Sequence, residues 1–321
     1  MTPLLSVCIP TRNRPECLAL LLDVLAPEAA EENVPLIIYD SSTDERTCQV
    51  VARKSAAGLQ THYVRNKEKT GIDENMLNVA ALAVSTYSLW LGDDDLLVAG
   101  AIKAISAELS EHSPDFLLLN AQCVSQDLSV YKDIVNPVVS DQLYNDPRAF
   151  FRQHWRCMPY GTLVVNNRLF SEGGGGVWRY VGTSHAYSGV IFDYLAQAFC
   201  EKGYVCVRVI KKPLVLLREV EKTWSATAAK ILLSEIPQWF DMLPVLYRAE
   251  IRPIKEDYLR SQVSPKNIIS MRLRGWITWR HYSLFYGKAG LFSWTVFGVV
   301  VLVPVSALAY IKRIFYRLKS K

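Results

Sequence analysis

Three consecutive carboxylates, Asp93, Asp94 and Asp95, are the residues of this 321-residue chain whose types and spacing most directly indicate chemistry. They follow the apolar run at residues 87–91, which predicts a short buried strand that leads straight into them. Adjacent carboxylates raise one another's pKa, and a divalent cation with oxygen ligands relieves that repulsion. Taken alone, the triplet favours a solvated acidic turn ahead of a helix, because short motifs match many unrelated sequences.

The elements around the triplet are predicted from apolar runs and turn residues. Pro15 suits the start of the first helix, and Pro27 is expected to stop it. Alternating strands and helices with short connections predict an α/β fold with a mostly parallel sheet covered on both faces. The predicted strands are residues 4–9, 34–39, 61–65, 87–91, 116–120, 204–209 and 214–217. The predicted helices are residues 15–26, 44–58, 72–84 and 98–109, and a last helix that Thr183 or Ser184 caps, that has His185 in its first turn and that ends at residue 202.

Three of the predicted strands end in polar loops, at residues 11–14, 40–44 and 93–95. The carboxyl ends of parallel strands meet at the same edge of a sheet, where open α/β sheets bind their ligands. We therefore expect the three loops to line one pocket. This convergence favours a metal and phosphate site over an isolated acidic turn.

Composition limits the class of protein. Hydrophobic residues make up 50% of the chain and charged residues 21%, which is typical of a globular core. The chain has a net charge of +5, and many of its basic residues stand late in the sequence among apolar runs. A membrane surface is therefore expected as a partner, and nucleic acid is not.

The seven cysteines form no CxxC pair, which indicates reduced thiols in a cytosolic compartment. No secretory signal is expected, since no charged and then apolar segment precedes the first strand.

The order of these motifs resembles the family 2 type glycosyltransferases, which have the GT-A fold, a Rossmann-like sheet flanked by helices. Residues 6–14, SVCIPTRNR, are similar to that family's first strand and loop, and residues 40–44, DSSTD, to its second. The resemblance is closest to the bacterial O-antigen sugar transferases of the abequosyltransferase kind, and it covers about the first 120 residues. Its further marks are Arg65, Asn66, Gly71, Asp73, Asn75, Leu77, Tyr87, Trp90 and residues 92–95.

The resemblance implies a nucleotide-sugar donor and a divalent metal, Mn or Mg. By it, Asp40 contacts the nucleotide base, and Thr11 and Arg14 lie beside the nucleotide in the loop that also holds Arg12. Lys69 is expected to flank the base or the ribose.

The metal ligands implied by the resemblance fall in the acidic triplet. The family motif reads Asp-x-Asp-Asp, and in that register Gly92 replaces the first Asp. Asp94 is then the first candidate ligand, with Asp95 beside it and Asp93 nearer the ribose. Because of Gly92, a register shifted by one residue stays open.

Glycosyl transfer also requires a base for the acceptor hydroxyl, because that hydroxyl loses its proton as it attacks. Many family 2 enzymes carry a Glu-Asp pair at the point where this chain has His185. We expect His185 to act as the base or as a further metal ligand, with Asp193, two helical turns on, as the second candidate. The alternatives are a hydrogen-bonded histidine at a helix start and an ordinary helix carboxylate. Arg218, beyond the last predicted strand, is expected to contact the donor diphosphate.

Composition and hydrophobic pattern divide the chain into three predicted regions. Residues 1–225 form the GT-A domain, with a nucleotide-sugar half at 1–120 and an acceptor half at 121–225. Residues 226–288 are helical, partly amphipathic, and rich in cations and aromatics, which is typical of a membrane interface. Residues 289–321 are a membrane segment with a basic tail. No charged residue occurs from 289 to 311, which is long enough either to span the bilayer or to bend back at Pro304.

The sequence thus predicts a metal-dependent, inverting glycosyltransferase for a hexosyl or deoxyhexosyl group. Its expected acceptor is a lipid-linked saccharide in bacterial cell-surface polysaccharide synthesis, at the cytoplasmic face of the inner membrane. A sugar nucleotidyltransferase is one alternative, but it would carry a Gly-rich, Lys-bearing loop after the first strand, and residues 11–14 have neither feature. A catalytically degenerate GT-A membrane scaffold is the other. It is motivated by Gly92 and by the missing Glu-Asp pair.

Overall fold

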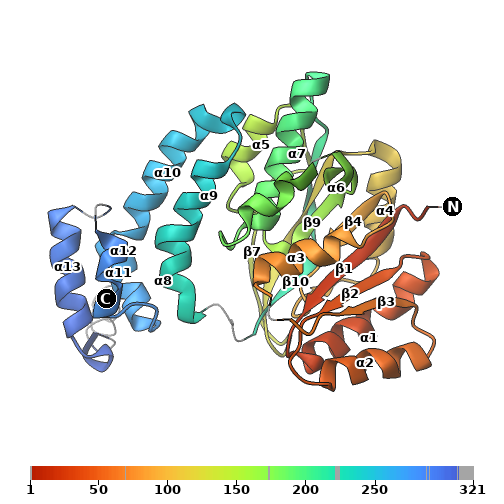
Figure 1. Ribbon diagram of the computed structural model, residues 1–321, viewed down its shortest axis with the longest axis horizontal. Helices are drawn as coiled ribbons and strands as arrows, with labels where there is room; N and C mark the ends of the chain where they lie inside the picture. The colour runs from red at the N-terminus through yellow and green to blue at the C-terminus, as the bar shows by residue number, and fades with distance from the viewer. Residues whose placement is uncertain are drawn as a thin grey trace. The chain divides into compact units, whose positions relative to one another are not determined.

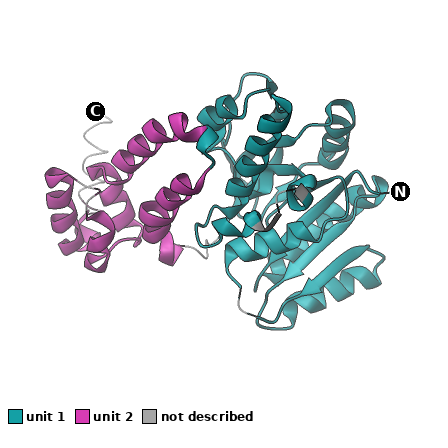
Figure 2. Ribbon diagram, turned by 45° about the horizontal axis from the view of Figure 1, so that its top comes forward, with its two compact units in different colours: residues 1–220, 244–246 teal, residues 221–243, 247–321 magenta. Residues whose placement is uncertain are grey.

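The structure is a computed structural model that describes residues 2–68, 70–172, 174–220, 225–286, 288, 290–308 and 310. The chain forms two compact units (Figure 2). Unit 1 comprises residues 1–220 and 244–246, and unit 2 comprises residues 221–243 and 247–321.

Unit 1 is built on a ten-stranded sheet with the strand order β3-β2-β1-β4-β9-β6-β10-β5, with β7 beside β6 and β8 beside β10 (Figure 1). Strands β3, β2, β1, β4, β6 and β10 run in one direction, and the others run against them. The sheet is therefore mostly parallel, as predicted. The strands are β1 (Leu5–Thr11), β2 (Leu36–Asp40), β3 (Thr61–Arg65), β4 (Tyr87–Trp90), β5 (Leu96–Leu97), β6 (Phe116–Ser125), β7 (Tyr131–Ile134), β8 (Gln142–Tyr144), β9 (Leu163–Asn166) and β10 (Val207–Glu219).

Helices cover both faces of this sheet (Figure 1). Ile38 and Tyr39 point to opposite faces of β2, because successive side chains alternate along a strand. Ile38 packs in the core with α1 and α4, whereas the Tyr39 hydroxyl accepts a hydrogen bond from Asn78 Nδ2 of α3 at 3.3 Å. The helices of unit 1 are α1 (Pro15–Glu31), α2 (Arg46–Ala56), α3 (Ile72–Ala81), α4 (Ala101–His112), α5 (Pro147–His154), α6 (Arg168–Glu172) and α7 (Ala186–Lys202), with 3-10 turns η1 (Tyr160–Thr162) and η2 (Gly174–Tyr180).

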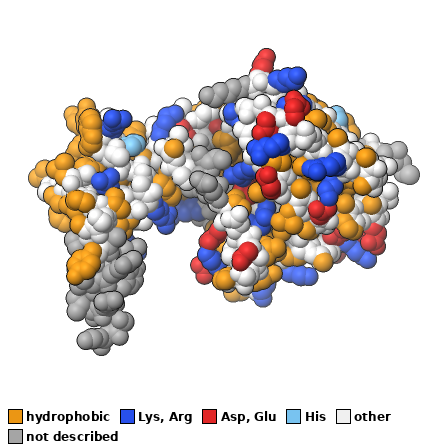
Figure 3. All heavy atoms as spheres, turned by 90° about the horizontal axis from the view of Figure 1, so that it is seen from below, with side chains coloured by type: hydrophobic (Ala, Val, Ile, Leu, Met, Phe, Trp, Pro, Cys, Tyr) orange, Lys and Arg blue, Asp and Glu red, His pale blue; other side chains and the backbone are white. Residues whose placement is uncertain are grey.

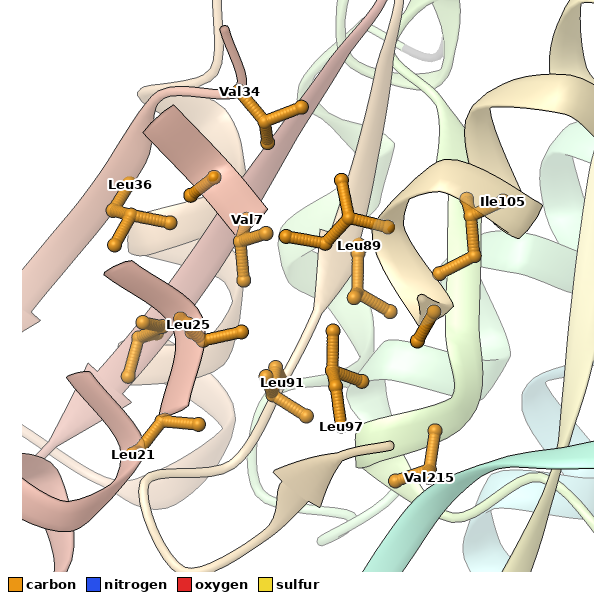
Figure 4. Close-up of a cluster of buried hydrophobic side chains, with 14 of the residues drawn as sticks. Val7, Leu21, Leu25, Val34, Leu36, Leu89, Leu91, Leu97, Ile105 and Val215 are labelled. Atoms are coloured by element: carbon orange, nitrogen blue, oxygen red, sulfur yellow. The ribbon is translucent and has the colours of Figure 1, made fainter. Parts of the chain in front are cut away.

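The main core lies between the sheet and the helices α1 and α4 (Figure 4). Alternate strand residues such as Val7 and Leu89 meet Leu21 and Leu25, which lie on one face of α1 at helical spacing. Fully burying each such side chain stabilises the fold by about 1.5–3 kcal/mol. The core therefore fixes the strand ends, and with them the loops that follow.

Two predicted boundaries are wrong. Pro27 does not stop α1, which continues to Glu31, since a proline removes one helical hydrogen bond while Ala29 beyond it is still buried. The two strands predicted at 204–209 and 214–217 are one strand, β10, whose pairing with β6 shifts register on both sides of Pro213. That irregularity accommodates a proline without ending the strand.

Unit 2 is helical and has its own core, in which Leu233, Ile268, Met271, Phe285 and Phe297 are buried together. No helix in the described part of the chain is long and apolar enough to cross a membrane. Within the segment predicted at 289–311, α13 ends at Leu302 because Val303 is extended ahead of Pro304. The elements of unit 2 are η3 (Ser225–Thr227), α8 (Ala228–Lys230), the π-helix η4 (Ile231–Glu235), α9 (Ile236–Met242), α10 (Arg248–Gln262), α11 (Pro265–Leu273), η6 (Trp279–His281), α12 (Tyr282–Phe285) and α13 (Leu291–Leu302).

Candidate active site

The predicted convergence of polar strand ends is present in unit 1. Strands β1 and β2 pair in parallel with Thr11 opposite Asp40, and the Ser41 amide donates to the Thr11 carbonyl at 3.0 Å. Strand β4 lies in parallel on the other side of β1, so the acidic triplet emerges at the same edge. The three loops therefore share one edge of the sheet.

Loop 11–14 is held against loop 40–44 by hydrogen bonds through Asn13. This residue has a positive φ of 54°, which Asn tolerates better than most residues do. The backbone N–H of Asn13 donates to Ser42 Oγ at 2.8 Å, and the side-chain Oδ1 of Asn13 accepts from the backbone N–H of Thr43 at 2.9 Å. The two loops are therefore positioned as one rigid piece.

The acidic triplet contacts loop 11–14 directly. Asp93 Oδ2 accepts from Thr11 Oγ1 at 2.7 Å, and Arg14 Nη1 lies 3.2 Å from Asp93 Oδ1 and 2.8 Å from Asp94 Oδ2. Burial, followed by the charge of Asp94, raises the pKa of Asp93 to about 6 even though Arg14 and Thr11 act against the shift. The cluster therefore lacks positive charge.

Arg218 approaches the triplet from β10, whose carboxyl end reaches the same sheet edge because β10 runs parallel to β6. Its Nε donates to the Asp94 carbonyl at 2.6 Å, and the residue is only 4% exposed. Among the described residues, Nη2 of Arg218 has no hydrogen-bond partner. A buried guanidinium N–H without a partner is costly, so this atom suits an anion supplied by a ligand.

Two glycines surround the carboxylate of Asp95. A Cβ atom on Gly161 of η1 would lie 2.8 Å from Asp95 Oδ2, closer than atoms of this kind approach. A Cβ atom on Gly92 would lie 3.0 Å from Asp94 Oδ1 and 3.1 Å from Asp95 Oδ2. The departure at Gly92 from the family motif therefore has a steric reason in this chain.

Asp40 is fully buried, and both of its carboxylate oxygens are engaged. Oδ1 accepts from the Ser42 amide at 2.8 Å, and Oδ2 accepts from the Tyr63 hydroxyl at 2.7 Å. Burial and the adjacent carboxylate raise the pKa of Tyr63 well above its ordinary value, so its hydroxyl keeps the proton that it donates. Asp40 therefore organises its loop, and its predicted contact with a nucleotide base stays a prediction.

Arg12 connects the first loop to the segment before α3, because its Nη1 donates to the Thr70 carbonyl at 3.0 Å. Thr70 in turn hydrogen-bonds Asn75 of α3, and Asn75 Nδ2 donates to Ser41 Oγ at 2.6 Å. Lys69, predicted to flank the nucleotide, lies outside the described residues.

Asp73 is a positioning residue whose task the sequence did not reveal. Its Oδ2 accepts from the amides of Gly182 and Ser184, each at 2.9 Å, and its Oδ1 accepts from the Ala186 amide at 3.3 Å. Asp73 of α3 thus caps the start of α7, where we expected Thr183 or Ser184 to do so. No local signal marks such a cap, because the partners are more than a hundred residues apart.

His185 stands immediately before α7. Its ring stacks on Tyr187 with 5.7 Å between ring centroids, and Tyr187 meets Tyr160 edge to face at 5.9 Å. Tyr160 precedes Gly161, which faces Asp95, and it stacks on Trp90 of β4 at 6.1 Å. This row of rings connects the predicted base to the acidic triplet.

Asp193 lies further along α7 in a different environment. Its Oδ1 accepts from Arg179 Nη2 at 2.6 Å and from the Tyr180 hydroxyl at 2.8 Å. The Tyr180 ring fits against α7 only because Gly189 lacks a side chain, since a Cβ atom there would lie 2.6 Å from the ring. These contacts give Asp193 a structural task in holding η2 on α7, and its catalytic role stays a prediction.

Within the described residues, no three His, Cys, Asp or Glu side chains are arranged to hold a metal ion. The edge instead presents the carboxylates of Asp94 and Asp95 with Arg14 and Arg218 nearby. A mostly parallel sheet with such an edge defines the class of α/β proteins that bind a phosphorylated ligand at their strand ends.

The comparisons with known proteins make this class specific. The family model described as glycosyl transferase family 2 matches residues 6–172, more than half of the chain. The chain belongs to this family. It is similar to the abequosyltransferase RfbV of Salmonella typhimurium, with 26% identity over 231 residues, 67% of this chain and 66% of that protein. The match thus spans slightly less than two thirds of that relative.

Solved structures share the fold. TarS 1–349 of S. aureus in complex with UDP has a TM-score of 0.61 and 15% identity, with 95% of this chain and 83% of that chain covered. The mannosyltransferase PcManGT from Pyrobaculum calidifontis, in complex with GDP-Man and Mn²⁺, has a TM-score of 0.53 and 15% identity over 93% of this chain and 79% of that chain. Together with the family match, these similarities agree with the predicted GT-A fold.

Proposed function

We propose that this protein is a glycosyltransferase that moves a sugar from a nucleoside-diphosphate sugar onto a hydroxyl group of a saccharide acceptor, in polysaccharide synthesis. The observation that carries the proposal is the meeting of Arg14, Arg218 and the acidic triplet at the carboxyl edge of the sheet. Relatives support the donor class, since solved structures of similar fold hold UDP, UDP-GlcNAc or GDP-Man.

The cations at this edge suit the charge that develops during transfer. When the bond between the anomeric carbon and the diphosphate breaks, the electron pair stays on the leaving phosphate oxygen. A preorganised donor aimed at that oxygen lowers the barrier, and each such donor contributes about 3–4 kcal/mol when water is excluded. In our proposal Arg218 is such a donor, through the Nη2 atom that has no hydrogen-bond partner among the described residues.

We propose Mn or Mg as the cofactor, with Asp94 as the first ligand and Asp95 as the second. The acidic triplet fits such an ion, because three adjacent carboxylates lie at the strand end with Arg14 as their cation contact; burial first and the charge of Asp94 second raise the pKa of Asp93 despite Arg14. Mg²⁺ typically uses one or two carboxylates together with substrate phosphates and water, so two carboxylates are sufficient protein ligands. A bound ion supplies electrostatic stabilisation of the leaving diphosphate.

His185 is the proposed base. The contact from Asp73 to the amides around it fixes the start of α7, so the imidazole has a defined position. In an inverting transfer the base accepts the proton of the acceptor hydroxyl on the side of the sugar opposite the diphosphate. The proposed transferred group is a hexosyl or deoxyhexosyl group, in line with the abequosyltransferase to which the chain is similar.

The acceptor is proposed to be linked to a lipid at the cytoplasmic face of the bacterial inner membrane. A transferase held at that surface meets an acceptor confined to the same surface, which raises its effective concentration. The basic and aromatic composition of residues 271–286 supports this placement.

A Cβ atom at position 92 would lie 3.0 Å from Asp94 Oδ1 and 3.1 Å from Asp95 Oδ2, so Gly92 is compatible with an intact carboxylate site as well as with the scaffold alternative. The nucleotidyltransferase alternative still lacks the Gly-rich, Lys-bearing loop that it requires, since residues 11–14 read Thr-Arg-Asn-Arg.

The proposal is tested by release of nucleoside diphosphate from a panel of nucleotide sugars, with Mn²⁺, with Mg²⁺ and with a chelator. We expect one donor to be hydrolysed slowly in the presence of metal and more rapidly when a saccharide acceptor is added. Release of pyrophosphate from a nucleoside triphosphate and a sugar phosphate would instead identify a nucleotidyltransferase. Neither reaction with any donor would favour the scaffold alternative and contradict the proposal.

A further inference from the structure

Helix α13 buries one face in unit 2 and leaves the other uncovered. Phe297 and Val300 are buried in the core of unit 2, where Phe297 stacks on Phe285 with 4.4 Å between ring centroids. On the opposite face Leu291 is 86% exposed, Phe292 72% and Leu302 81%. The helix therefore has an inner apolar face, which its core needs, and an outer apolar face, which the core does not explain.

The outer face is continuous along the helix. Leu291, Thr295, Val299 and Leu302 recur at helical spacing and are all exposed. The hydroxyl of Thr295 donates back to the Leu291 carbonyl at 3.0 Å, so it is satisfied within the helix. A helix that faces water carries polar side chains on its outer face, whereas this face offers water no charged group.

Aromatic side chains extend this apolar surface. Trp279 of η6 and Tyr282 of α12 are exposed, as is Tyr286. The guanidinium of Arg280 lies over the Trp279 ring at 5.7 Å, which brings a cation beside an exposed indole. Tryptophan and tyrosine with adjacent cations are typical of side chains at the headgroup level of a membrane. We call the exposed residues Trp279, Tyr282, Tyr286, Leu291, Phe292, Val299 and Leu302 the outer apolar face.

The positive charge of residues 258–321 indicates which kind of partner the outer apolar face would bind. Residues 258–321 contain no Asp or Glu and eleven Lys or Arg. In Figure 3, hydrophobic side chains gather with interspersed cations on the left of the molecule, in the part that forms unit 2. A second copy of this chain would bring the same excess of positive charge to the contact, which disfavours self-association. An anionic lipid surface satisfies both the charge and the apolar side chains.

We propose that the outer apolar face of unit 2 binds in the interface of an anionic lipid bilayer, with α13 lying along the membrane surface. Twelve residues at about 1.5 Å each give α13 a length of about 18 Å, shorter than the hydrocarbon core of roughly 30 Å. Helix α13 by itself is therefore too short to cross a bilayer, and in this proposal it lies along the surface. This inference deepens the proposed placement at a membrane by naming the residues that make the contact.

The test is sedimentation of the full chain with vesicles of phosphatidylcholine alone and of phosphatidylcholine mixed with phosphatidylglycerol. We expect binding to the mixed vesicles only. The double variant Phe292→Ser with Leu302→Ser should reduce the partition coefficient about a hundredfold, since each lost side chain removes about a tenfold contribution. The matched control is Val84→Ser with Val139→Ser, two exposed valines of unit 1. It should bind vesicles like the unchanged protein.

Equal binding of the double variant and the control would overturn the proposal, as would equal binding to neutral and anionic vesicles. A dimer in light scattering that the double variant dissociates, without vesicle binding, would assign the face to a second copy. Trp279→Ser provides an independent variant if the double variant fails to fold. Nucleoside diphosphate release with a soluble acceptor should be unchanged in all of these variants, so a failure here leaves the proposed transferase activity separately testable.

Discussion

At the scale of single residues, the pKa of Asp93 depends on burial and on the charges at the sheet edge. It accepts hydrogen bonds from Thr11 and Arg14, and its pKa is nevertheless raised to about 6, because burial and Asp94 outweigh both donors. One guanidinium therefore does not neutralise the acidic triplet. A divalent cation bound at the triplet, as we propose, would supply the missing positive charge.

Gly161 offers a test of whether the position of Asp95 matters. In the Gly161→Ala variant the new methyl group must displace the Asp95 carboxylate, because the two would otherwise lie 2.8 Å apart. We expect donor turnover to fall about tenfold or more with little change in melting temperature, since small displacements at a reacting site cost large factors in rate.

The control for this variant is Gly298→Ala. Gly298 lies inside α13 and has no atom within 4 Å of the Cβ position, so its replacement should leave turnover unchanged. Equal turnover of Gly161→Ala and the unchanged protein would remove Asp95 from the site.

The sequence predicted the residues of the triplet and of loops 11–14 and 40–44, because strand ends of a parallel sheet are forced to one edge. Arg218 does lie at this edge, where its Nε donates to the Asp94 carbonyl, and its predicted contact with the donor diphosphate stays a prediction. It did not reveal Gly161, since a glycine that makes room for a distant carboxylate has no local pattern.

At the scale of elements, the start of α7 depends on a residue of α3. In the Asp73→Ala variant the amides of Gly182 and Ser184 lose their acceptor. Loss of a capping carboxylate costs about 0.5–2 kcal/mol, so we expect urea denaturation to detect a decrease of that size in the free energy of unfolding.

The same variant should weaken turnover, because His185 loses its fixed position. The conservative variant Asp73→Asn keeps one acceptor oxygen and should recover part of both losses. If Asp73→Ala unfolds at the same urea concentration as the unchanged protein, the cap contributes nothing to stability.

His154, at the end of α5, makes the stability of the fold depend on pH, because it is buried as a neutral ring. Asn136 Nδ2 donates to His154 Nδ1 at 3.1 Å, and burial lowers the pKa of His154 from 6.5 to about 4. The unfolded chain therefore binds a proton at a higher pH than the folded chain does. Stability should fall as the pH decreases from 6.5 towards 4, by on the order of 3 kcal/mol from this residue.

The measurement is the free energy of unfolding of the His154→Gln variant and of the unchanged protein at several pH values. Glutamine does not titrate in this range, so the variant should lose this part of the pH dependence. Parallel curves for the two proteins between pH 6.5 and 4 would contradict a buried neutral His154.

The element boundaries that the sequence missed have a common cause. Pro27 was expected to end the first helix, and two separate strands were predicted on either side of Pro213, but tertiary packing keeps α1 and β10 continuous around these prolines. Strand β5 was not predicted, because a two-residue strand exists only through its pairing with β10.

At the scale of the whole molecule, the sequence predicted the alternating strands and helices of about the first 120 residues and the mostly parallel sheet, since strand and helix periodicities alternate clearly there. It did not predict β5, β7, β8, β9, α5 or α6, because these elements are short or lie in the less periodic part of unit 1. The helices of unit 2 were less predictable, because apolar residues serve both its core and its outer apolar face. Residues 289–311 lack charge in sequence, and only the burial of Phe297 and Val300 separates the inner face of α13 from the outer one. Composition alone predicted a membrane partner, which stays a prediction, and it could not separate core residues from those of the outer apolar face.

The central claim, a metal and diphosphate site at the acidic triplet, is tested most directly by calorimetric titration of a panel of nucleoside diphosphates with Mn²⁺. We predict that at least one binds, that a chelator abolishes binding, and that Asp94→Asn weakens it about tenfold or more while the fold is retained. The control Glu111→Gln removes an exposed carboxylate of α4 and should bind like the unchanged protein. Binding that is unaffected by the chelator and by Asp94→Asn, or no binding of any nucleoside diphosphate, would contradict the account.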